Sequence, residues 1–174
     1  SDIFFVLLGN QSGEAERLGA AYAGTATERF IIFGGYRSDI ASIMQSASIG
    51  VIASVGWDSF TRSAIEMAAS GLPLVVSRLQ GLAETVVDGE TGILIEPGNH
   101  AELAARIIEL VDNSARRVER SRRSSRASGF PSAGHIPLSD IRFGSYCFGC
   151  RQGYFKMSIL KRVWPLCRPS GFRR

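Results

Sequence analysis

Residues 49–76, IGVIASVGWDSFTRSAIEMAASGLPLVV, contain the pattern that decides the fold of this chain. The apolar run Ile49–Ile52 has strand length and is followed by an amphipathic, helix-length stretch, Phe60–Ala69. A Gly-Leu-Pro turn then leads into a second apolar run, Leu74–Val76. Apolar strands that alternate with helices are typical of βα units that build a parallel sheet.

The same alternation continues on both sides of this stretch. Three further apolar runs have strand length: Ile3–Leu8, Phe30–Phe33 and Ile93–Ile95. Three further stretches have the apolar spacing of helices: Glu14–Ala23, Ser38–Ser46 and Ala101–Val111. The sequence therefore predicts an α/β fold, a Rossmann-like parallel sheet flanked by helices, over about the first 112 residues.

The last of these helices has the clearest start signal in the chain. Asn99 occupies the N-cap position and Glu102 follows three residues later, which together predict a capping box. An apolar stripe follows along one face of the same helix, made of Leu103, Ile107, Leu110 and Val111. We expect this stripe to face the core.

The remainder of the chain has a different composition. Residues 1–113 carry six basic and 14 acidic residues, a net charge of −8, whereas residues 114–174 carry 14 basic and two acidic residues, a net charge of +12. Beyond Asp112 the helical periodicity fails, and arginine, serine and scattered glycine, proline and aromatic residues predominate. The pattern predicts neither helix nor strand in this irregular basic tail.

Composition also limits the functional classes. The chain has no run of about 18 apolar residues and its first residues lack a secretory signal, so we expect a cytoplasmic protein. The tail residues His135, Cys147, Cys150 and Cys167 have irregular spacing, which does not predict a zinc site. The basic tail admits an anionic membrane or nucleic acid as partner, but out-of-frame or disordered sequence explains its composition better.

In an open parallel sheet, ligands bind at the carboxyl ends of the strands. The third such loop leads into the helix that carries Glu66, and the N–H groups of Phe60 and Thr61 at its start would face a diphosphate. Asp58 lies about 12 Å from Glu66 along this segment, so the two carboxylates could hold the hexose and ribose ends of a nucleotide sugar. Alternatively, Asp58 or Ser59 only caps the helix and Glu66 is a solvated surface residue.

Several ordered motifs give this sequence a specific resemblance. The stretch from Gly34 to Gly98 contains EMAASGLPLVV at residues 66–76 and DGETGILIEPG at residues 88–98. It resembles the C-terminal domain of family 4 retaining glycosyltransferases of the GT-B fold, in which two glutamates are separated by seven residues and the second of them begins a similar phrase. The resemblance extends over residues 1–126, which we take as the donor-binding domain, with residues 127–174 as the tail.

The resemblance implies a set of donor-binding residues. Glu66 would bind the donor ribose, Asp58 would replace the family's first glutamate beside the transferred sugar, and the helix start would contact the diphosphate. Because aspartate is one methylene shorter than glutamate, the reach of this first carboxylate is reduced. The full set implied is Gly9, Asn10, Gly35, Tyr36, Asp58, Ser59, Phe60, Thr61 and Glu66.

The same resemblance implies the activity. It implies a glycosyltransferase that takes a UDP- or GDP-sugar without a metal cofactor, at the cytoplasm or the cytoplasmic membrane face, in cell-envelope or exopolysaccharide synthesis. The glycan or lipid-linked acceptor would bind an N-terminal domain, and the arginine and lysine that neutralise the leaving diphosphate would precede the matched region. We therefore expect this chain alone to bind donor without transferring sugar. The alternative is a noncatalytic nucleotide-binding or interaction module whose tail binds anionic membrane or nucleic acid.

Overall fold

A computed structural model describes residues 3–9, 13–56, 61–127 and 156–160 of the 174-residue chain. The strands are β1 (Phe4–Leu8), β2 (Ile31–Gly35), β3 (Ile49–Ile52), β4 (Leu74–Ser77), β5 (Gly92–Ile95) and β6 (Lys156–Leu160). The helices are α1 (Glu14–Ala20), the 3-10 turn η1 (Glu28–Phe30), α2 (Ile40–Ser46), α3 (Arg62–Ala69), α4 (Gln80–Ala83), α5 (His100–Asp112) and α6 (Ser114–Ala127).

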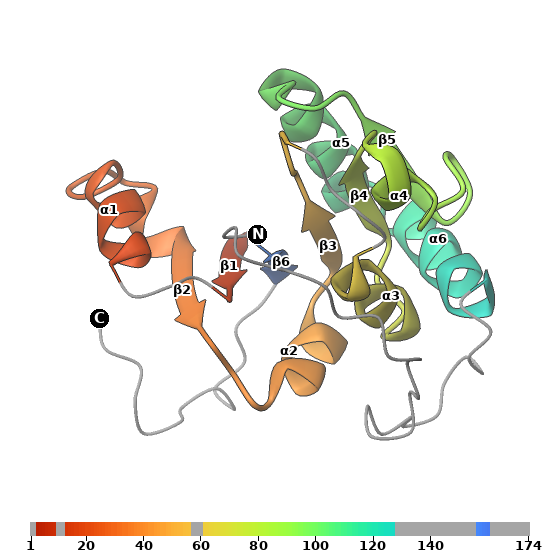
Figure 1. The fold of residues 1–174 in the computed structure, drawn as a ribbon, viewed down its shortest axis with the longest axis horizontal. Helices are drawn as coiled ribbons and strands as arrows, with labels where there is room; N and C mark the ends of the chain where they lie inside the picture. Colours follow the sequence, from red (N-terminus) through yellow and green to blue (C-terminus); the bar gives the residue numbers. More distant parts are fainter. Residues whose placement is uncertain (1–2, 10–12, 57–60, 128–155, 161–174) are drawn as a thin grey trace.

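One six-stranded sheet organises these elements in the order β2-β1-β6-β3-β4-β5 (Figure 1). β1 pairs with β2, β3 with β4 and β4 with β5, in each case in parallel. This confirms the predicted α/β class. All five strands predicted from the sequence are present, and their bounds differ from the prediction by no more than two residues.

The chain leaves the middle of the sheet in two directions. From β1 it moves outward to β2 at one edge, and from β3 it moves through β4 to β5 at the other edge. The order therefore reverses between β1 and β3, which is the topological switch point of a doubly wound sheet. Ligands bind such sheets in the crevice outside the carboxyl ends of the strands at this point.

The strand β6 occupies that central position and was not predicted from the sequence. It runs antiparallel to both neighbours, with Phe5 opposite Ile159 on one side and Gly50 opposite Ser158 on the other. The basic tail therefore contributes one strand to the sheet. Its pairing depends on two strands more than 100 residues away in the sequence, which local periodicity does not detect.

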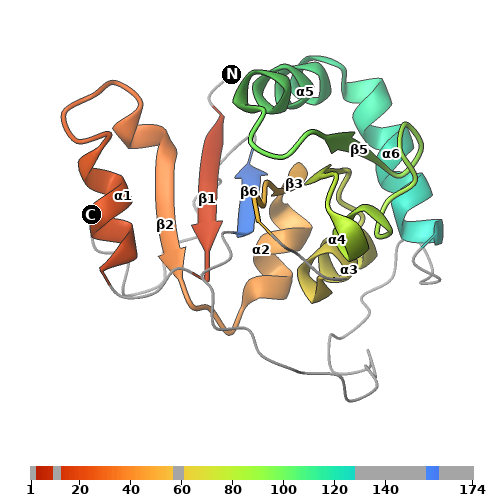
Figure 2. The ribbon, with the colours of Figure 1, turned by 45° about the horizontal axis from the view of Figure 1, so that its top comes forward.

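Helices cover the two faces of the sheet in separate layers (Figure 2). On one face, α5 packs Ile107, Leu110 and Val111 against alternate residues of β3, β4 and β5, as the predicted apolar stripe requires. On the other face, Met44 of α2 and Met67 of α3 pack with residues of β3 and β4. Because β3 and β4 are buried on both faces, they have no polar alternation in their sequence.

The predicted cap of α5 forms in the structure. The Asn99 side chain accepts a hydrogen bond from the Glu102 backbone N–H, with an Oδ1–N distance of 3.0 Å. The Glu102 carboxylate accepts from the Asn99 side-chain amide and from the Glu96 backbone N–H. Glu102 therefore holds the turn that precedes α5, which orients the loop between β5 and α5.

The helix α6 corrects the prediction that periodicity ends at Asp112. Asn113 begins the helix by accepting from the Arg116 backbone N–H at 3.0 Å. Arg117 then donates to the carbonyls of Leu110 and Val111 at the end of α5, and Arg120 donates to the Gly92 carbonyl at 2.7 Å. The apolar pattern is weak because arginine side chains provide much of the packing of α6 on its neighbours.

An ionic cluster connects α5 to α6 and gives a pH-dependent prediction. Arg116 contacts the Glu109 carboxylate at 2.6 Å and Arg106 contacts it at 3.1 Å. Hydrogen bonding from Arg116, with a smaller contribution from Arg106, lowers the pKa of Glu109 below its ordinary value. Because the folded pKa is lowered, the stabilisation is present above the unfolded-state pKa and is lost as the pH falls through the folded-state pKa.

The substitution Glu109→Gln is therefore expected to lower the free energy of unfolding by about 0.5–1 kcal/mol near neutral pH. The difference from wild type should shrink at a second, acidic pH below the ordinary glutamate pKa of about 4.3, because Glu109 becomes protonated as the pH falls through its lowered folded-state pKa. Urea unfolding at the two pH values measures this, with Glu90→Gln, an exposed loop residue, as control. A pH-independent difference would show that the charge of Glu109 is not responsible.

Candidate functional site

The predicted site residues divide into three sets. Gly9 follows β1, Gly35 ends β2 and Tyr36 follows it, whereas Thr61 is the N-cap residue of α3 and Glu66 lies within that helix. The other four predicted residues lie outside the described part of the chain: Asn10, Asp58, Ser59 and Phe60. The structure therefore places five of the nine residues, all on segments that follow the carboxyl ends of parallel strands.

The turns after β1 and β2 are joined directly. The Gly9 backbone N–H donates to the Gly35 carbonyl at 2.8 Å. Both glycines have positive φ angles, 77° and 60°, in the left-handed region that glycine adopts without strain. The Tyr36 side chain follows immediately and is 85% exposed, so its ring is available for stacking on a planar ligand.

The helix α3 places Glu66 in a buried position. Glu66 is 6% exposed, and its near neighbours on the helix, Ala64 and Met67, are fully buried. This contradicts the alternative that Glu66 is a solvated surface residue. A buried carboxylate is costly without partners, so its position requires polar contacts.

The partner of Glu66 is Arg62, one helical turn earlier. The Arg62 Nε lies 2.7 Å from the Glu66 Oε1, and the two side chains are 65% and 8% exposed respectively. Arg62 is not among the site residues predicted from the sequence, although an arginine and a glutamate at i,i+4 spacing are a recognisable helical pair. The pair fixes the Glu66 carboxylate near the beginning of α3.

The two parts of the site lie on either side of β6. Neighbouring strands are about 4.8 Å apart, so the carboxyl ends of β1 and β3 are about 10 Å apart. One part presents the turns at Gly9 and Gly35, and the other presents the N-terminus of α3. A ligand with two polar ends can span this distance across the switch point.

The start of α3 also contains an unsatisfied polar atom. Thr61 occupies the N-cap position in an extended conformation, but its side chain does not cap the helix. The Thr61 Oγ1 is buried and has no hydrogen-bond partner among the described residues. Buried polar atoms are nearly always satisfied, so this hydroxyl is available to a ligand.

A second unsatisfied hydroxyl lies at the end of β4. Ser77 is 1% exposed, and its Oγ has no partner within the described part of the chain. A cavity of about 20 Å³ lies between this serine and the start of α5, which is enough room for one water molecule. Its small volume makes it a hydration position rather than a substrate site.

The turn after β2 contains an ion pair. The Arg37 side chain is 21% exposed and donates to both carboxylate oxygens of Asp39, at 2.7 and 2.6 Å. The hydrogen bond from Arg37 lowers the pKa of Asp39 below its ordinary value. The pair fixes the turn that precedes α2.

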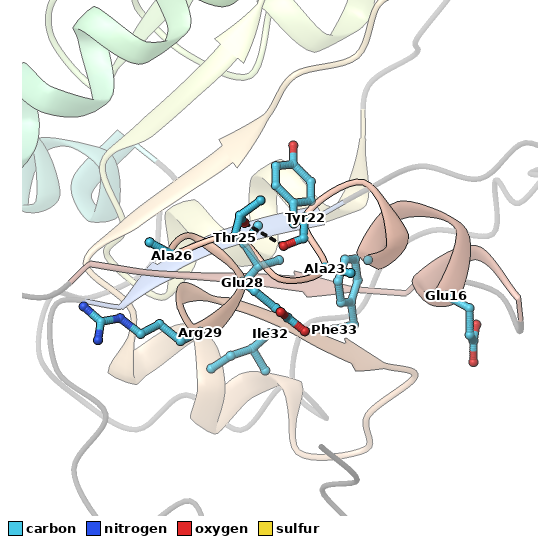
Figure 3. A pocket seen from close by; sticks show the side chains of 11 residues that line it. Glu16, Tyr22, Ala23, Thr25, Ala26, Glu28, Arg29, Ile32 and Phe33 are labelled. Atoms are coloured by element: carbon cyan, nitrogen blue, oxygen red, sulfur yellow. Dashed lines mark hydrogen bonds between the residues drawn. The ribbon is translucent and has the colours of Figure 1, made fainter.

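A larger cavity of about 790 Å³ lies away from these residues, beside α1 and β2 (Figure 3). Its lining includes Tyr22, Arg29 and Phe33. Arg29 lies over the Phe30 ring, with 4.6 Å between the guanidinium carbon and the ring centroid. The cavity flanks the outer edge of β2, away from the switch point, and we therefore favour the site at the start of α3.

The described residues contain neither a metal-binding group of side chains nor a membrane-spanning helix. No group of three His, Cys, Asp or Glu side chains there could hold a metal ion. Within the same residues, no helix is both long enough and apolar enough to span a bilayer. The cysteines discussed above all lie outside this part of the chain.

The fold and the site together define a doubly wound α/β domain whose ligand edge lies at the carboxyl ends of its strands. The chain belongs to the family described as glycosyl transferases group 1, which matches residues 1–113. This supports the family resemblance seen in the sequence motifs at the level of glycosyltransferases of the GT-B fold.

Two curated relatives have similar sequences. The chain is 38% identical over 107 residues to the D-inositol 3-phosphate glycosyltransferase of Corynebacterium kroppenstedtii, covering 59% of this chain and 23% of the relative. It is 34% identical over 85 residues to a glycogen synthase of Mycobacterium tuberculosis, covering 49% of this chain and 20% of that protein. The matched regions thus span about a quarter or less of these relatives.

Solved structures show the same fold. Anabaena Alr3699/HepE in complex with UDP-glucose matches with a TM-score of 0.66 at 23% identity, over 71% of this chain and 35% of that protein. The C-terminal domain of a glycosyl transferase group 1 family protein from Francisella tularensis matches with a TM-score of 0.58 at 24% identity, over 64% of this chain and 58% of that chain. At these identities the matches establish the fold.

Proposed function

We propose that this chain is the donor-binding, C-terminal half of a retaining glycosyltransferase and that it binds a nucleotide sugar across the switch point. The observation that carries the proposal is the buried Glu66 carboxylate near the start of α3. A carboxylate at this depth can accept two hydrogen bonds from the vicinal hydroxyls of a ribose. Family membership supports the activity, and the complex of Anabaena Alr3699/HepE with UDP-glucose supports the donor class.

The other site residues have complementary roles in this proposal. The N-terminus of α3 binds the diphosphate through its unpaired N–H groups and the positive end of the helix dipole. The Thr61 hydroxyl donates a further hydrogen bond to a phosphate oxygen. Tyr36 and the joined turns at Gly9 and Gly35 lie beside the base. Asp58 contacts the transferred sugar, and Asn10, Ser59 and Phe60 complete the donor site.

The physiological role follows from the relatives by analogy. We propose a hexosyl transfer to a glycan or lipid-linked acceptor in cell-envelope or exopolysaccharide synthesis, at the cytoplasmic side of the membrane. The acceptor site belongs to the whole protein, and the regions matched here span 23% and 20% of the two curated relatives. Donor binding is therefore the step that this chain can be tested for directly.

The alternative function, a noncatalytic module whose basic tail binds anionic membrane or nucleic acid, receives less support. Four arginines of α6 have protein partners: Arg116 and Arg123 bind glutamates, while Arg117 and Arg120 bind backbone carbonyls. Cations that are engaged in this way are less available to an anionic surface. We therefore retain donor binding as the proposed function.

Calorimetric titration of the full chain with UDP-, GDP- and ADP-glucose tests the proposal. We expect one of the three donors to bind with one-to-one stoichiometry, and the preferred base to be identified by its affinity. Circular dichroism of the same sample verifies that the protein is folded. A folded chain that binds none of the three donors would contradict the proposed function.

Metal removal gives a further prediction for this site. Because the diphosphate is bound by N–H groups and side chains, we propose that donor binding needs no divalent cation. Addition of excess EDTA is expected to change the dissociation constant of the donor less than twofold, measured by calorimetry against a sample supplied with magnesium. A loss of binding that magnesium restores would show that the donor binds as a metal complex.

A further inference from the structure

The first turn of α3 has an electrostatic arrangement that disfavours the helix on its own. The positive end of a helix dipole is stabilised by acidic residues and destabilised by cations. The first turn of α3 contains no acidic residue and begins with Arg62, and its N-cap residue Thr61 makes no side-chain capping bond. An anion bound at this position would reverse the unfavourable balance.

The helix α5 of the same chain provides a direct comparison. Its N-cap residue Asn99 accepts from the Glu102 N–H, and Glu102 supplies an acid to the first turn. The start of α5 is therefore satisfied by its own side chains. At the start of α3, by contrast, the Thr61 Oγ1 is buried without a partner among the described residues, and the Arg62 guanidinium, which pairs with Glu66, lies in the first turn. Both observations favour an external anion at this position.

The Arg62 guanidinium is positioned to reach such an anion. Its Nε contacts the Glu66 Oε1 at 2.7 Å, while 65% of its side chain is exposed to solvent. Glu66 is the buried member of the pair, with 8% of its side chain exposed. The arginine is therefore the more exposed partner of the pair, and its reorientation displaces less of the packed core than movement of the buried glutamate would.

We propose that Arg62 is the cation that this chain supplies to the donor diphosphate, and that it exchanges partners when the donor binds. In the absence of donor, Arg62 neutralises the buried Glu66 carboxylate. When donor binds, the guanidinium turns to a phosphate oxygen and the ribose hydroxyls donate to the released carboxylate. This inference rests on the proposed function and adds to it a charge-matching residue outside the site predicted from the sequence.

The proposed exchange can be measured because Arg62 contacts the phosphate of the donor, whereas Glu66 contacts its ribose. Replacement of Arg62 removes the contact to phosphate and leaves the carboxylate that recognises ribose. Arg62→Gln is expected to lower the affinity for the nucleoside diphosphate at least tenfold at low salt, and Arg62→Lys is expected to retain most of it. The loss should shrink as salt is raised, because the missing interaction is between charges.

A matched control separates this effect from the loss of any surface ion pair. Arg106→Gln removes an exposed helical arginine that pairs with Glu109 three residues away, on α5. We expect Arg106→Gln to bind the diphosphate as wild type does. Thermal unfolding of each variant verifies that the fold is retained.

A spectroscopic measurement reports the exchange in the intact chain. With 15N-labelled arginine, the Arg62 Nε–H resonance is assigned by its absence in Arg62→Gln. Titration with the nucleoside diphosphate is expected to shift this resonance, and titration with the matching uncharged nucleoside at the same concentration is expected to leave it unchanged.

The outcomes distinguish this inference from the proposed function. If wild type binds no nucleotide, the proposed function fails together with the inference. If wild type binds the diphosphate but Arg62→Gln binds it within twofold, or the Arg62 resonance does not move, the inference alone is overturned. A tenfold or greater loss that is insensitive to salt would also overturn it, because it would indicate a structural role for Arg62.

Discussion

The substitution Glu66→Ala is expected to lower the affinity for the donor by about 10- to 150-fold, because it removes charge-assisted hydrogen bonds worth about 1.5–3 kcal/mol. Glu66 is the only carboxylate of the predicted site that lies within the described residues, and it is 6% exposed. Calorimetric titration with the donor selected from the three nucleotide sugars measures the change.

The control for this prediction is Glu90→Ala, since Glu90 lies in the exposed turn before β5. It should bind donor as wild type does. The fold of Glu66→Ala should persist, because the arginine left without its carboxylate is 65% exposed and remains hydrated. Donor affinity that is equal in Glu66→Ala and wild type would remove Glu66 from the site.

The substitution Leu74→Ala is expected to lower the free energy of unfolding by about 2–5 kcal/mol. Leu74 is fully buried in β4, at the centre of the face that α2 and α3 cover. Its packing is tight: a methyl group added at Gly50 would lie 2.8 Å from both the Leu74 Cδ2 and the Met67 Sδ. Truncation therefore leaves a cavity that its neighbours can only partly fill.

Urea unfolding measures this loss, and Ile108→Ala is the matched control. Ile108 is 56% exposed on α5, so its truncation should change the free energy of unfolding by less than about 0.5 kcal/mol. Because Leu74 packs directly beneath α3, donor binding by Leu74→Ala should also weaken as the helix becomes less well fixed. Equal stability of the two variants would contradict the assigned core.

The sequence predicted the parallel strands well because interior strands of α/β sheets are continuous apolar runs. Ile49–Ile52 was predicted with the bounds that β3 has. Helix starts were less accurate: α2 begins at Ile40 rather than Ser38, after the turn that the Arg37–Asp39 pair fixes. Such pairs depend on side-chain geometry and leave little signal in a hydrophobic pattern.

The elements that were missed depend on distant partners. α6 has few apolar residues, and its helix is stabilised by arginine contacts to α5 and to the Gly92 carbonyl. β6 gains its order from pairing with β1 and β3. α4, with only the residues Gln80–Ala83, is too short for a periodic signal.

In the candidate site, too, positions set by strand order were predicted and contacts set by tertiary packing were not. The sequence placed Gly9, Gly35 and Glu66 on segments that follow parallel strands, because the strand order of a doubly wound sheet determines that edge. The burial of Glu66 and its contact with Arg62 depend on how α3 packs against the sheet. Spacing alone therefore left the solvated alternative open, and tertiary packing decided against it.

Hydrogen–deuterium exchange of the full chain, with and without the donor selected by calorimetry, tests the central claim most directly. We predict slower exchange in two separate places, the start of α3 at residues 61–66 and the turn at Gly35 and Tyr36, with unchanged exchange around the cavity beside α1 and β2. Protection confined to residues 22–33 around that cavity would contradict donor binding at the switch point and place the ligand at the outer edge of the sheet.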